Sequence, residues 1–307
     1  MRRPAVLLVL AVALAGCGVG SGSGAAPTGV NVVVSRDFGA RKLRDVDSSK
    51  LPSGETVMRL LERKFTVETR YGGGFVQTLE GLSGGKDAQG RPVDWFYYVN
   101  GIEADTGAAE RKVAPGDRIW WDRHDWGATQ RIPAVVGSWP EPFLTGTEGK
   151  KIPLALVCAG EERSCDEVQQ RLSDEGIEGV SRAGISSGVG QKLLRIVVGP
   201  WSKISGEPAA HQLAEGPKVS GVYVRPGDDA FGLLDEDGKV AQTETGSVGL
   251  VAATRFGEQQ PTWIVTGTDD AGVAAAAAAL RSDVLANRFA VALVDGRGEA
   301  LPIRQAP

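Results

Sequence analysis

Side chains suited to acid–base or nucleophilic chemistry are sparse in this sequence. Its two histidines, His124 and His211, lie far apart in the chain. Asp122, His124 and Asp125 form the only cluster of histidine with carboxylates, and alternation along a strand would place the first two on one face. A metal site needs three or four converging ligands, and no second His or Cys lies nearby in the sequence. We therefore interpret the cluster as a solvated strand end and predict no metal site.

Several patterns that carry catalysis in other proteins are incomplete here. The Gly-rich stretch 184–190 lacks the Lys-Ser or Lys-Thr that completes a phosphate-binding loop, and no His-Glu-x-x-His motif is present. Acidic residues number 38, so a glycosidase-like carboxylate pair stays an alternative, but no pair stands out by its spacing. We predict a protein that is not an enzyme, with no catalytic residues and no resident cofactor.

The first residues predict export rather than a cytosolic location. A positive start, Met1-Arg2-Arg3, precedes the apolar run Ala5–Ala13, which is shorter than the roughly 20 residues that span a bilayer. This pattern is typical of a secretory signal peptide, here residues 1–16. The run ends in Leu14-Ala15-Gly16-Cys17, which resembles the bacterial lipobox and implies that Cys17 is diacylated and becomes the first mature residue.

Lipidation of Cys17 would determine where the protein works. Two acyl chains hold a protein stably to a membrane, whereas one chain binds weakly. We therefore expect a lipoprotein on the outer face of the cell membrane, with the lipid bilayer as a partner through the Cys17 anchor. Residues 17–28 contain the lipidated Cys and a stretch rich in Gly and Ser, which predicts a flexible tether.

The two remaining cysteines, Cys158 and Cys165, would face an oxidising compartment, where such pairs close into disulfides. Cys158 ends a predicted strand and Cys165 begins a predicted helix, so a disulfide would fix the corner between them. A redox pair is the alternative, because a helix N-terminus lowers the pKa of a thiol. The spacing is longer than Cys-x-x-Cys, which favours the structural disulfide.

Composition limits the size, class and partners of the protein. A chain of 307 residues is long enough for two domains, and 42% hydrophobic residues can form a buried core. The net charge of -4 argues against a nucleic-acid partner, because binding to phosphates requires a basic surface.

Residues 29–148 predict a β-rich domain with one helix, an α+β fold. Strand signals cover four stretches: 30–34, 75–79, 95–99 and 118–121. A helix with one apolar face follows Ser53. Asn100-Gly101 is a strong hairpin signal, because a type I′ turn needs two residues at positive φ. The Pro-rich stretch 132–142 predicts an extended strap or linker.

Four motifs of this domain follow one another in a recognisable order. They are Ser53-Gly54-Glu55-Thr56-Val57-Met58 with Leu60-Leu61, Gly74-Phe75-Val76 with Gly81-Leu82, Trp95-Phe96-Tyr97-Tyr98-Val99-Asn100-Gly101, and Gly116-Asp117-Arg118-Ile119-Trp120-Trp121. This order resembles the transcobalamin C-terminal-like family, the domain of unknown function DUF4430 of bacterial surface proteins, and the Pro-rich stretch resembles a tail in actinobacterial members. In transcobalamin and intrinsic factor the related domain closes over one face of cobalamin. The resemblance implies a module that binds a small ligand or a surface, with a corrinoid-like compound as one candidate.

The candidate ligand-binding residues are six aromatics in two strands: Trp95, Phe96, Tyr97, Tyr98, Trp120 and Trp121. Alternation puts Trp95 and Tyr97 on one face of their strand, and Phe96 and Tyr98 on the other. One face must pack on the helix, and the other could form a flat platform for a macrocycle, a sugar ring or an aromatic peptide side chain. The alternative is that both faces are buried, since aromatic residues are common in strands.

Residues 149–307 change to strands alternating with helices, which indicates an α/β sandwich of unassigned family. The expected strands are 152–157, 193–198, 219–224, 248–253, 263–266 and 289–294, with a hairpin at 231–240. The expected helices are 165–174, 209–214 and 271–280. The stretch 194–201 resembles the second half of cell-wall-binding SPOR-type domains, which implies contact with peptidoglycan.

Together these patterns predict a membrane-anchored surface lipoprotein that binds a small ligand without chemistry. The alternative is an adhesion or structural protein that contacts peptidoglycan, glycan or another surface protein. An apolar cavity of ligand size between the domains would favour the first function, and a flat exposed aromatic patch would favour the second. Two close carboxylates, one with a raised pKa, would indicate an enzyme.

Overall fold

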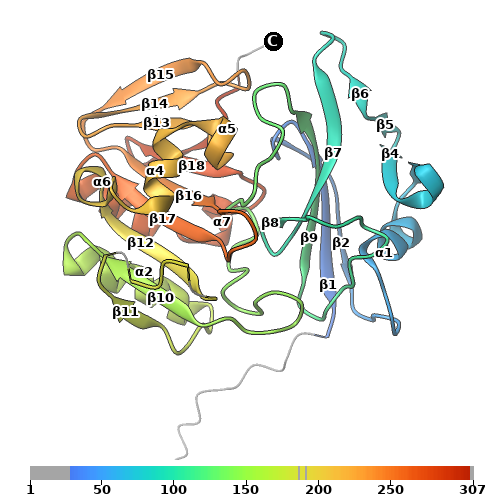
Figure 1. Ribbon diagram of the computed structural model, residues 1–307, viewed down its shortest axis with the longest axis horizontal. Helices are drawn as coiled ribbons and strands as arrows, with labels where there is room; N and C mark the ends of the chain where they lie inside the picture. Colours follow the sequence, from blue (N-terminus) through green and yellow to red (C-terminus); the bar gives the residue numbers. More distant parts are fainter. Residues whose placement is uncertain (1–27, 186, 191, 305–307) are drawn as a thin grey trace, which may run out of the picture.

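The computed structural model describes residues 28–185, 187–190 and 192–304. We call residues 28–148 the N-terminal part and residues 149–304 the C-terminal part, and the two parts pack against each other along one face of a sheet (Figure 1). The predicted signal peptide, Cys17 and nearly all of the tether lie outside the described residues, so lipidation stays a prediction. In the portion that is described, no helix combines the length and the apolar character needed to cross a membrane.

A six-stranded sheet forms the centre of the N-terminal part. Its strands are β1 (Val30–Arg36), β2 (Arg41–Ser48), β6 (Gly85–Lys86), β7 (Pro92–Val99), β8 (Ile102–Glu103) and β9 (Arg118–Asp125). They lie in the order β2-β1-β9-β7-β6, and β8 pairs with the end of β7. The β1–β9 pair is parallel and the other pairs are antiparallel.

One helix and a small sheet cover the face of this sheet that points away from the C-terminal part (Figure 1). They are α1 (Val57–Lys64) and the strands β3 (Val67–Arg70), β4 (Phe75–Leu79) and β5 (Leu82–Ser83). The 3-10 helix η1 (Tyr71–Gly73) connects β3 to β4 and has no buried residue. The Thr56 side chain caps α1 by accepting a hydrogen bond from the Arg59 backbone N–H at 3.3 Å. The N-terminal part thus combines β-sheets with the α-helix α1, which confirms the predicted α+β fold.

The predicted turn after the aromatic strand is present. Asn100 and Gly101 have φ values of 54° and 76°, the positive values that a type I′ turn requires at both central residues. The buried Asn100 amide donates to Asp117 Oδ1 at 3.0 Å and to Gly146 O at 2.8 Å. The hairpin is therefore held in place by neighbouring loops as well as by its own backbone.

A seven-stranded mixed sheet forms the centre of the C-terminal part (Figure 1). Its strands, in sheet order, are β11 (Ser181–Ala183), β10 (Leu154–Cys158), β12 (Leu194–Pro200), β17 (Thr262–Gly267), β16 (Gly249–Thr254), β18 (Ala290–Val294) and β19 (Arg297–Leu301). The first four strands are parallel to one another, and β16, β18 and β19 are added by antiparallel pairing.

Other elements cover both faces of this second sheet. One face packs on α2 (Glu162–Asp174) and α6 (Asp270–Ala278), near the short α7 (Ser282–Leu285). The opposite face packs on α3 (Trp201–Ile204), α4 (Pro208–Ala214), α5 (Pro217–Ser220) and a small sheet of β13 (Val224–Pro226), β14 (Ala230–Leu234) and β15 (Val240–Thr245). This layering confirms the predicted α/β sandwich, and the second core continues into the N-terminal part.

A disulfide joins Cys158 and Cys165, which confirms the pairing that the sequence predicts. Their Cα atoms lie 6.1 Å apart, within the ordinary range for disulfides. Cys158 is the last residue of β10, and Cys165 faces the core from the first turn of α2. The bond therefore fixes the corner between this strand and this helix.

Several segments differ from the prediction, and two of them have a clear physical reason. The strand expected at 219–224 is instead the end of α5, a turn and the start of β13. Pro217 at the first position of α5 favours a helix start, and Gly221, at φ 74°, ends the helix in the left-handed region. Sequence patterns also do not predict β2, because this strand is largely polar and lies at an exposed edge of its sheet.

Residues 132–143 form a buried strap between the two parts rather than a flexible linker. Ile132 and Val135 belong to the core that both parts share, and Val136 and Trp139 belong to the core beneath α2 and α6. These four side chains are at most 3% exposed. The strap therefore adds to both cores of the C-terminal part.

The strap also buries a carboxyl group, that of Glu141, which is 2% exposed. Its Oε2 accepts hydrogen bonds from the backbone N–H and the hydroxyl of Thr145, both at 2.9 Å. Desolvation by burial nevertheless raises the pKa of Glu141 from 4.5 to about 7. The folded protein therefore prefers the neutral carboxyl group up to near-neutral pH.

Glu141 should make the protein less stable as the pH rises. Its pKa is higher in the folded than in the unfolded chain, so its stabilising effect is complete below pH 4.5 and is lost as the pH rises to about 7. At ~1.4 kcal/mol per pKa unit, the loss is about 3 kcal/mol. In urea unfolding over this pH range, Glu141→Gln should remove much of the slope, whereas Glu178→Gln, at an exposed position, should retain it. Equal slopes for all three proteins would contradict this account.

Candidate functional site

Three of the six candidate aromatic residues, Trp95, Tyr97 and Trp121, face the core beneath α1. All three are less than a tenth exposed. The Trp95 indole N–H donates to Leu82 O at 2.9 Å, and the Tyr97 hydroxyl donates to Thr106 O at 2.6 Å. The Tyr97 ring stacks on Trp121 with centroids 4.8 Å apart. The polar tips of Trp95 and Tyr97 are thus already engaged inside the protein.

The other three, Phe96, Tyr98 and Trp120, face the C-terminal part. Tyr98 and Trp120 are fully buried, and Phe96 is half-buried. Phe289 of the C-terminal part meets Tyr98 and Trp120 edge to face, with ring centroids 5.6 and 5.0 Å away. Burial raises the pKa of the Tyr98 hydroxyl well above its usual value, so this group stays neutral.

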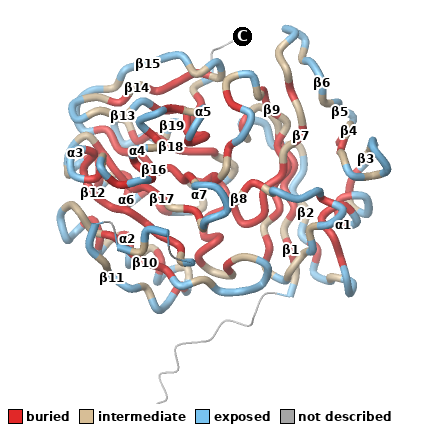
Figure 2. Tube along the Cα trace, viewed as in Figure 1, coloured by how far each residue is buried: buried red, intermediate tan, exposed pale blue. Residues whose placement is uncertain are grey.

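The aromatic strand β7 is therefore covered on both faces, and it forms no open platform (Figure 2). Burial of both faces is the alternative that the sequence left open, because aromatic residues are common in strands. A ligand-binding role for the six aromatic residues stays a prediction, but their exposed area is too small for a molecule to settle on them in this conformation.

The interpretation of Asp122 and His124 as a solvated strand end is wrong. They are 0% and 3% exposed, because the C-terminal part covers this face of β9. The Asp122 carboxylate accepts four hydrogen bonds of 2.5 to 3.0 Å, from Ser35 Oγ, Phe38 N, Gly39 N and His124 Nδ1. The sequence around position 122 could not reveal this burial, because residues far along the chain produce it.

This cluster contains Ser, His and Asp but lacks the geometry of a hydrolase. In a catalytic triad the His lies between Ser and Asp and takes the Ser proton. Here Ser35 and His124 both bind to Asp122 instead. Trp120 Nε1 donates to Ser35 Oγ at 2.7 Å, and the His124 ring stacks on Phe96 with centroids 4.4 Å apart. The cluster therefore ties β9 to β1 and does not activate a nucleophile.

Neither a serine nucleophile motif nor a metal site is supported by the described structure. Residues 184–188 have Gly-x-Ser-x-Gly spacing, but a nucleophile elbow requires a helix directly after a strand. Between β11 and β12, the residues that the structure describes form no helix. Across the described chain, no three His, Cys, Asp or Glu side chains come together in a group that could hold a metal ion.

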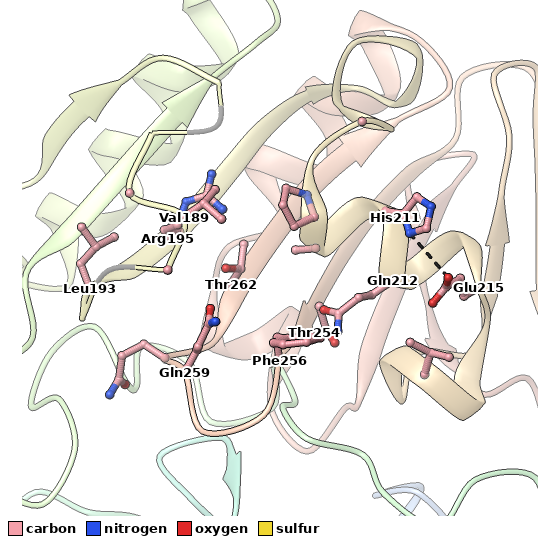
Figure 3. Close-up of a pocket in the computed structure, with 17 residues that line it drawn as sticks. Val189, Leu193, Arg195, His211, Gln212, Glu215, Thr254, Phe256, Gln259 and Thr262 are labelled. Atoms are coloured by element: carbon pink, nitrogen blue, oxygen red, sulfur yellow. Dashed lines mark ion pairs between the residues drawn. The ribbon is translucent and has the colours of Figure 1, made fainter.

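A cavity of about 550 Å³, which we call the main cavity, lies where β12 and β17 begin (Figure 3). Its wall comes from three separate segments of the C-terminal part. Leu193 directly precedes β12 and Arg195 lies at its start (Figure 3). His211 and Gln212 belong to α4, and Phe256 belongs to the loop between β16 and β17 (Figure 3). The cavity thus lies within the C-terminal part rather than between the two domains.

Exposed apolar side chains are prominent in the lining of the main cavity. Phe256, Val219 and Val189 are 67%, 44% and 42% exposed. Each of these side chains forgoes the stabilisation that burial would provide. A ligand that covered them would gain affinity from the same apolar surface.

A few polar groups face the same space. Gln212, Gln259 and Gln260 contribute amides, and Gln260 Oε1 is a buried acceptor with no hydrogen-bond partner in the described structure. Arg195 is 4% exposed and binds Glu207 at 2.9 Å, so it shapes the cavity rather than presenting a free charge. Mostly apolar walls with a few polar groups are typical of small-molecule sites.

Sequence patterns do not reveal the main cavity, because its walls come from segments that are distant in the chain. Two local signals nevertheless bear on it. The Gly-rich stretch 184–190 is predicted as a loop, and part of it forms one wall. Phe256 lies alone in a polar loop between two apolar strands, where an aromatic side chain has no local partner to bury it.

Residues 54–125 match the family model of the domain of unknown function DUF4430, which confirms the resemblance carried by the four motifs. The main cavity lies outside this segment. No curated protein matches the chain. Among solved structures, the chain is similar to a "putative metal binding protein" from Ruminococcus gnavus, at 17% identity and a TM-score of 0.26, over 32% of this chain and 97% of the other. A likeness at this TM-score carries no inference about the present chain.

Proposed function

We propose that this protein binds a small, largely apolar molecule in the main cavity without changing it chemically. The observation that carries the proposal is the cavity, whose volume of about 550 Å³ is within the range of small-molecule sites. Its exposed apolar side chains supply affinity through the hydrophobic effect. The amides of Gln212 and Gln259 in its wall offer hydrogen bonds that orient the ligand.

Two features favour this function over adhesion through an aromatic surface. The aromatic strand is buried on both faces. In the described residues, the strongly exposed aromatic side chains are Tyr71 and Phe256, one in each part, and they form no shared patch. A corrinoid-like molecule stays the alternative ligand, because the resemblance of the N-terminal domain implies it.

We also propose that the protein works at the outer face of the cell membrane, held there by a lipid on Cys17. The support is the sequence pattern of residues 1–17, which the structure does not describe. In a bacterial host, the full-length protein should incorporate labelled palmitate, and Cys17→Ser should abolish the label. Equal labelling of both proteins would contradict the lipid anchor.

The main cavity should bind the neutral apolar dye N-phenyl-1-naphthylamine, whose fluorescence rises in apolar surroundings. Phe256→Ala should weaken binding about tenfold, because covering part of an aromatic ring contributes ~1.5 kcal/mol. Phe256 is 67% exposed, so its removal should leave the fold intact. Tyr71→Ala removes another exposed ring, in the N-terminal part, and should leave dye binding unchanged.

The absence of dye binding, or equal binding by Phe256→Ala and the wild-type protein, would contradict the proposed site. Titration with cobalamin and cobinamide, followed by Trp fluorescence, tests the alternative ligand. Saturable quenching that Trp95→Ala abolishes and Phe256→Ala preserves would move the site to the aromatic strand.

A further inference from the structure

A second cavity, about 670 Å³ in volume, opens beside the main cavity, and we call it the adjoining cavity. It lies between the two parts of the protein, where residues 127–133 face α5 and the β16–β17 loop. Gln212, Val219 and Phe256 line both cavities. One elongated molecule could therefore occupy both spaces, with Phe256 at their junction.

The lining of the adjoining cavity is cationic. Arg131, Lys218 and Arg255 line it, and none of the described residues in its wall is Asp or Glu. The chain as a whole carries a net charge of -4, so this positive charge is a local feature. A concave surface lined by charges of one sign attracts ligands of the opposite sign.

Both arginines have acidic neighbours, but these leave part of each guanidinium available. Arg131 Nε lies 3.2 Å from Glu103 Oε2, and Arg255 Nη2 lies 3.5 Å from Asp105 Oδ2. A guanidinium carries five N–H donors. Arg131 uses one of them on Glu103, and Arg255 uses two, because its Nε also donates to Gln259 O at 2.7 Å. Each guanidinium therefore keeps unused donors. The exposed Lys218 has no ion-pair partner among the described residues. An anion in this cavity could therefore bind donors from three side chains.

We propose that the ligand is an amphiphile whose apolar body fills the main cavity and whose anionic group, a carboxylate or a phosphate, binds in the adjoining cavity. This inference rests on the proposed function and adds the chemical class of the ligand. Hydrogen bonds from Arg and Lys to an anion are charge-assisted and roughly twice as strong as neutral ones. The ligand also covers Phe256, the exposed ring between the two cavities.

Displacement of N-phenyl-1-naphthylamine from the mature chain by three ten-carbon compounds tests this inference. Decanol, decanoate and decyl phosphate share one alkyl chain and differ in the head group, and each is used below its micelle concentration. At least one of the two anions should displace the dye at a concentration about tenfold lower than decanol does, because only an anion gains charge-assisted contacts. Added salt should reduce this difference by screening the charges.

Variants identify the cations involved. Lys218→Gln should reduce the advantage of the anions over decanol several-fold while leaving decanol binding unchanged, because the substitution removes a charge and keeps a polar side chain. Lys86→Gln removes an exposed lysine from β6 in the N-terminal part and serves as the matched control. Both positions are exposed, so neither substitution should disturb the fold.

The outcomes separate this inference from the proposed function. If the dye binds and decanol displaces it as well as both anions do, the anionic group is excluded and the apolar site stands. If the dye does not bind at all, the proposed function fails and this inference fails with it. Stronger displacement by decanoate supports a fatty acid as the ligand, and stronger displacement by decyl phosphate supports a phosphate-bearing lipid.

Discussion

The contact of Phe289 with the N-terminal sheet determines how the two parts of this protein fit together. Its ring lies among four rings of the N-terminal part, with centroids 5.0 to 5.6 Å away: Trp120, His124, Phe38 and Tyr98. All four contacts are edge to face, a geometry that the charge distribution of aromatic rings favours. Beside them, the backbone must approach closely at Gly39, where a Cβ would lie 1.9 Å from Asn287 O. The two parts therefore form one continuous structure and not two independent modules.

Because the two parts pack together at this contact, the aromatic strand β7 is enclosed and cannot serve as an open binding surface. Alternation along β7 sends Trp95 and Tyr97 into one core, and Phe96 and Tyr98 toward the other, so no face of the strand is left open for a ligand. Exposed apolar side chains gather instead around loops of the C-terminal part, next to the junction with the N-terminal part. A rigid scaffold that carries its binding groups on loops is a common arrangement in proteins. The buried sheets and the strap then act as support for the two cavities.

Local rules in the sequence predict much of this structure. The Asn100-Gly101 turn and the disulfide of Cys158 with Cys165 depend on a few neighbouring residues, and both are confirmed. The DUF4430 segment is recognised from four short motifs in a fixed order, and it is confirmed too. The burial of Asp122 and His124 is not predicted, because it depends on residues distant in the chain: Ser35, Phe38 and Gly39 bind Asp122, and Phe289 contacts His124. The main cavity escapes prediction for the same reason, since its walls come together only when the C-terminal sheet has formed.

Hydrogen exchange of backbone amides, measured with and without sodium decanoate, tests most directly whether the main cavity is the binding site. Binding there predicts slower exchange in the segments 188–190, 206–219 and 254–260, which contribute to the wall of the main cavity, and no change in β7 and β9. Slower exchange confined to β7 and β9 would contradict the account, because it would place the ligand on the aromatic strand that the two cores enclose.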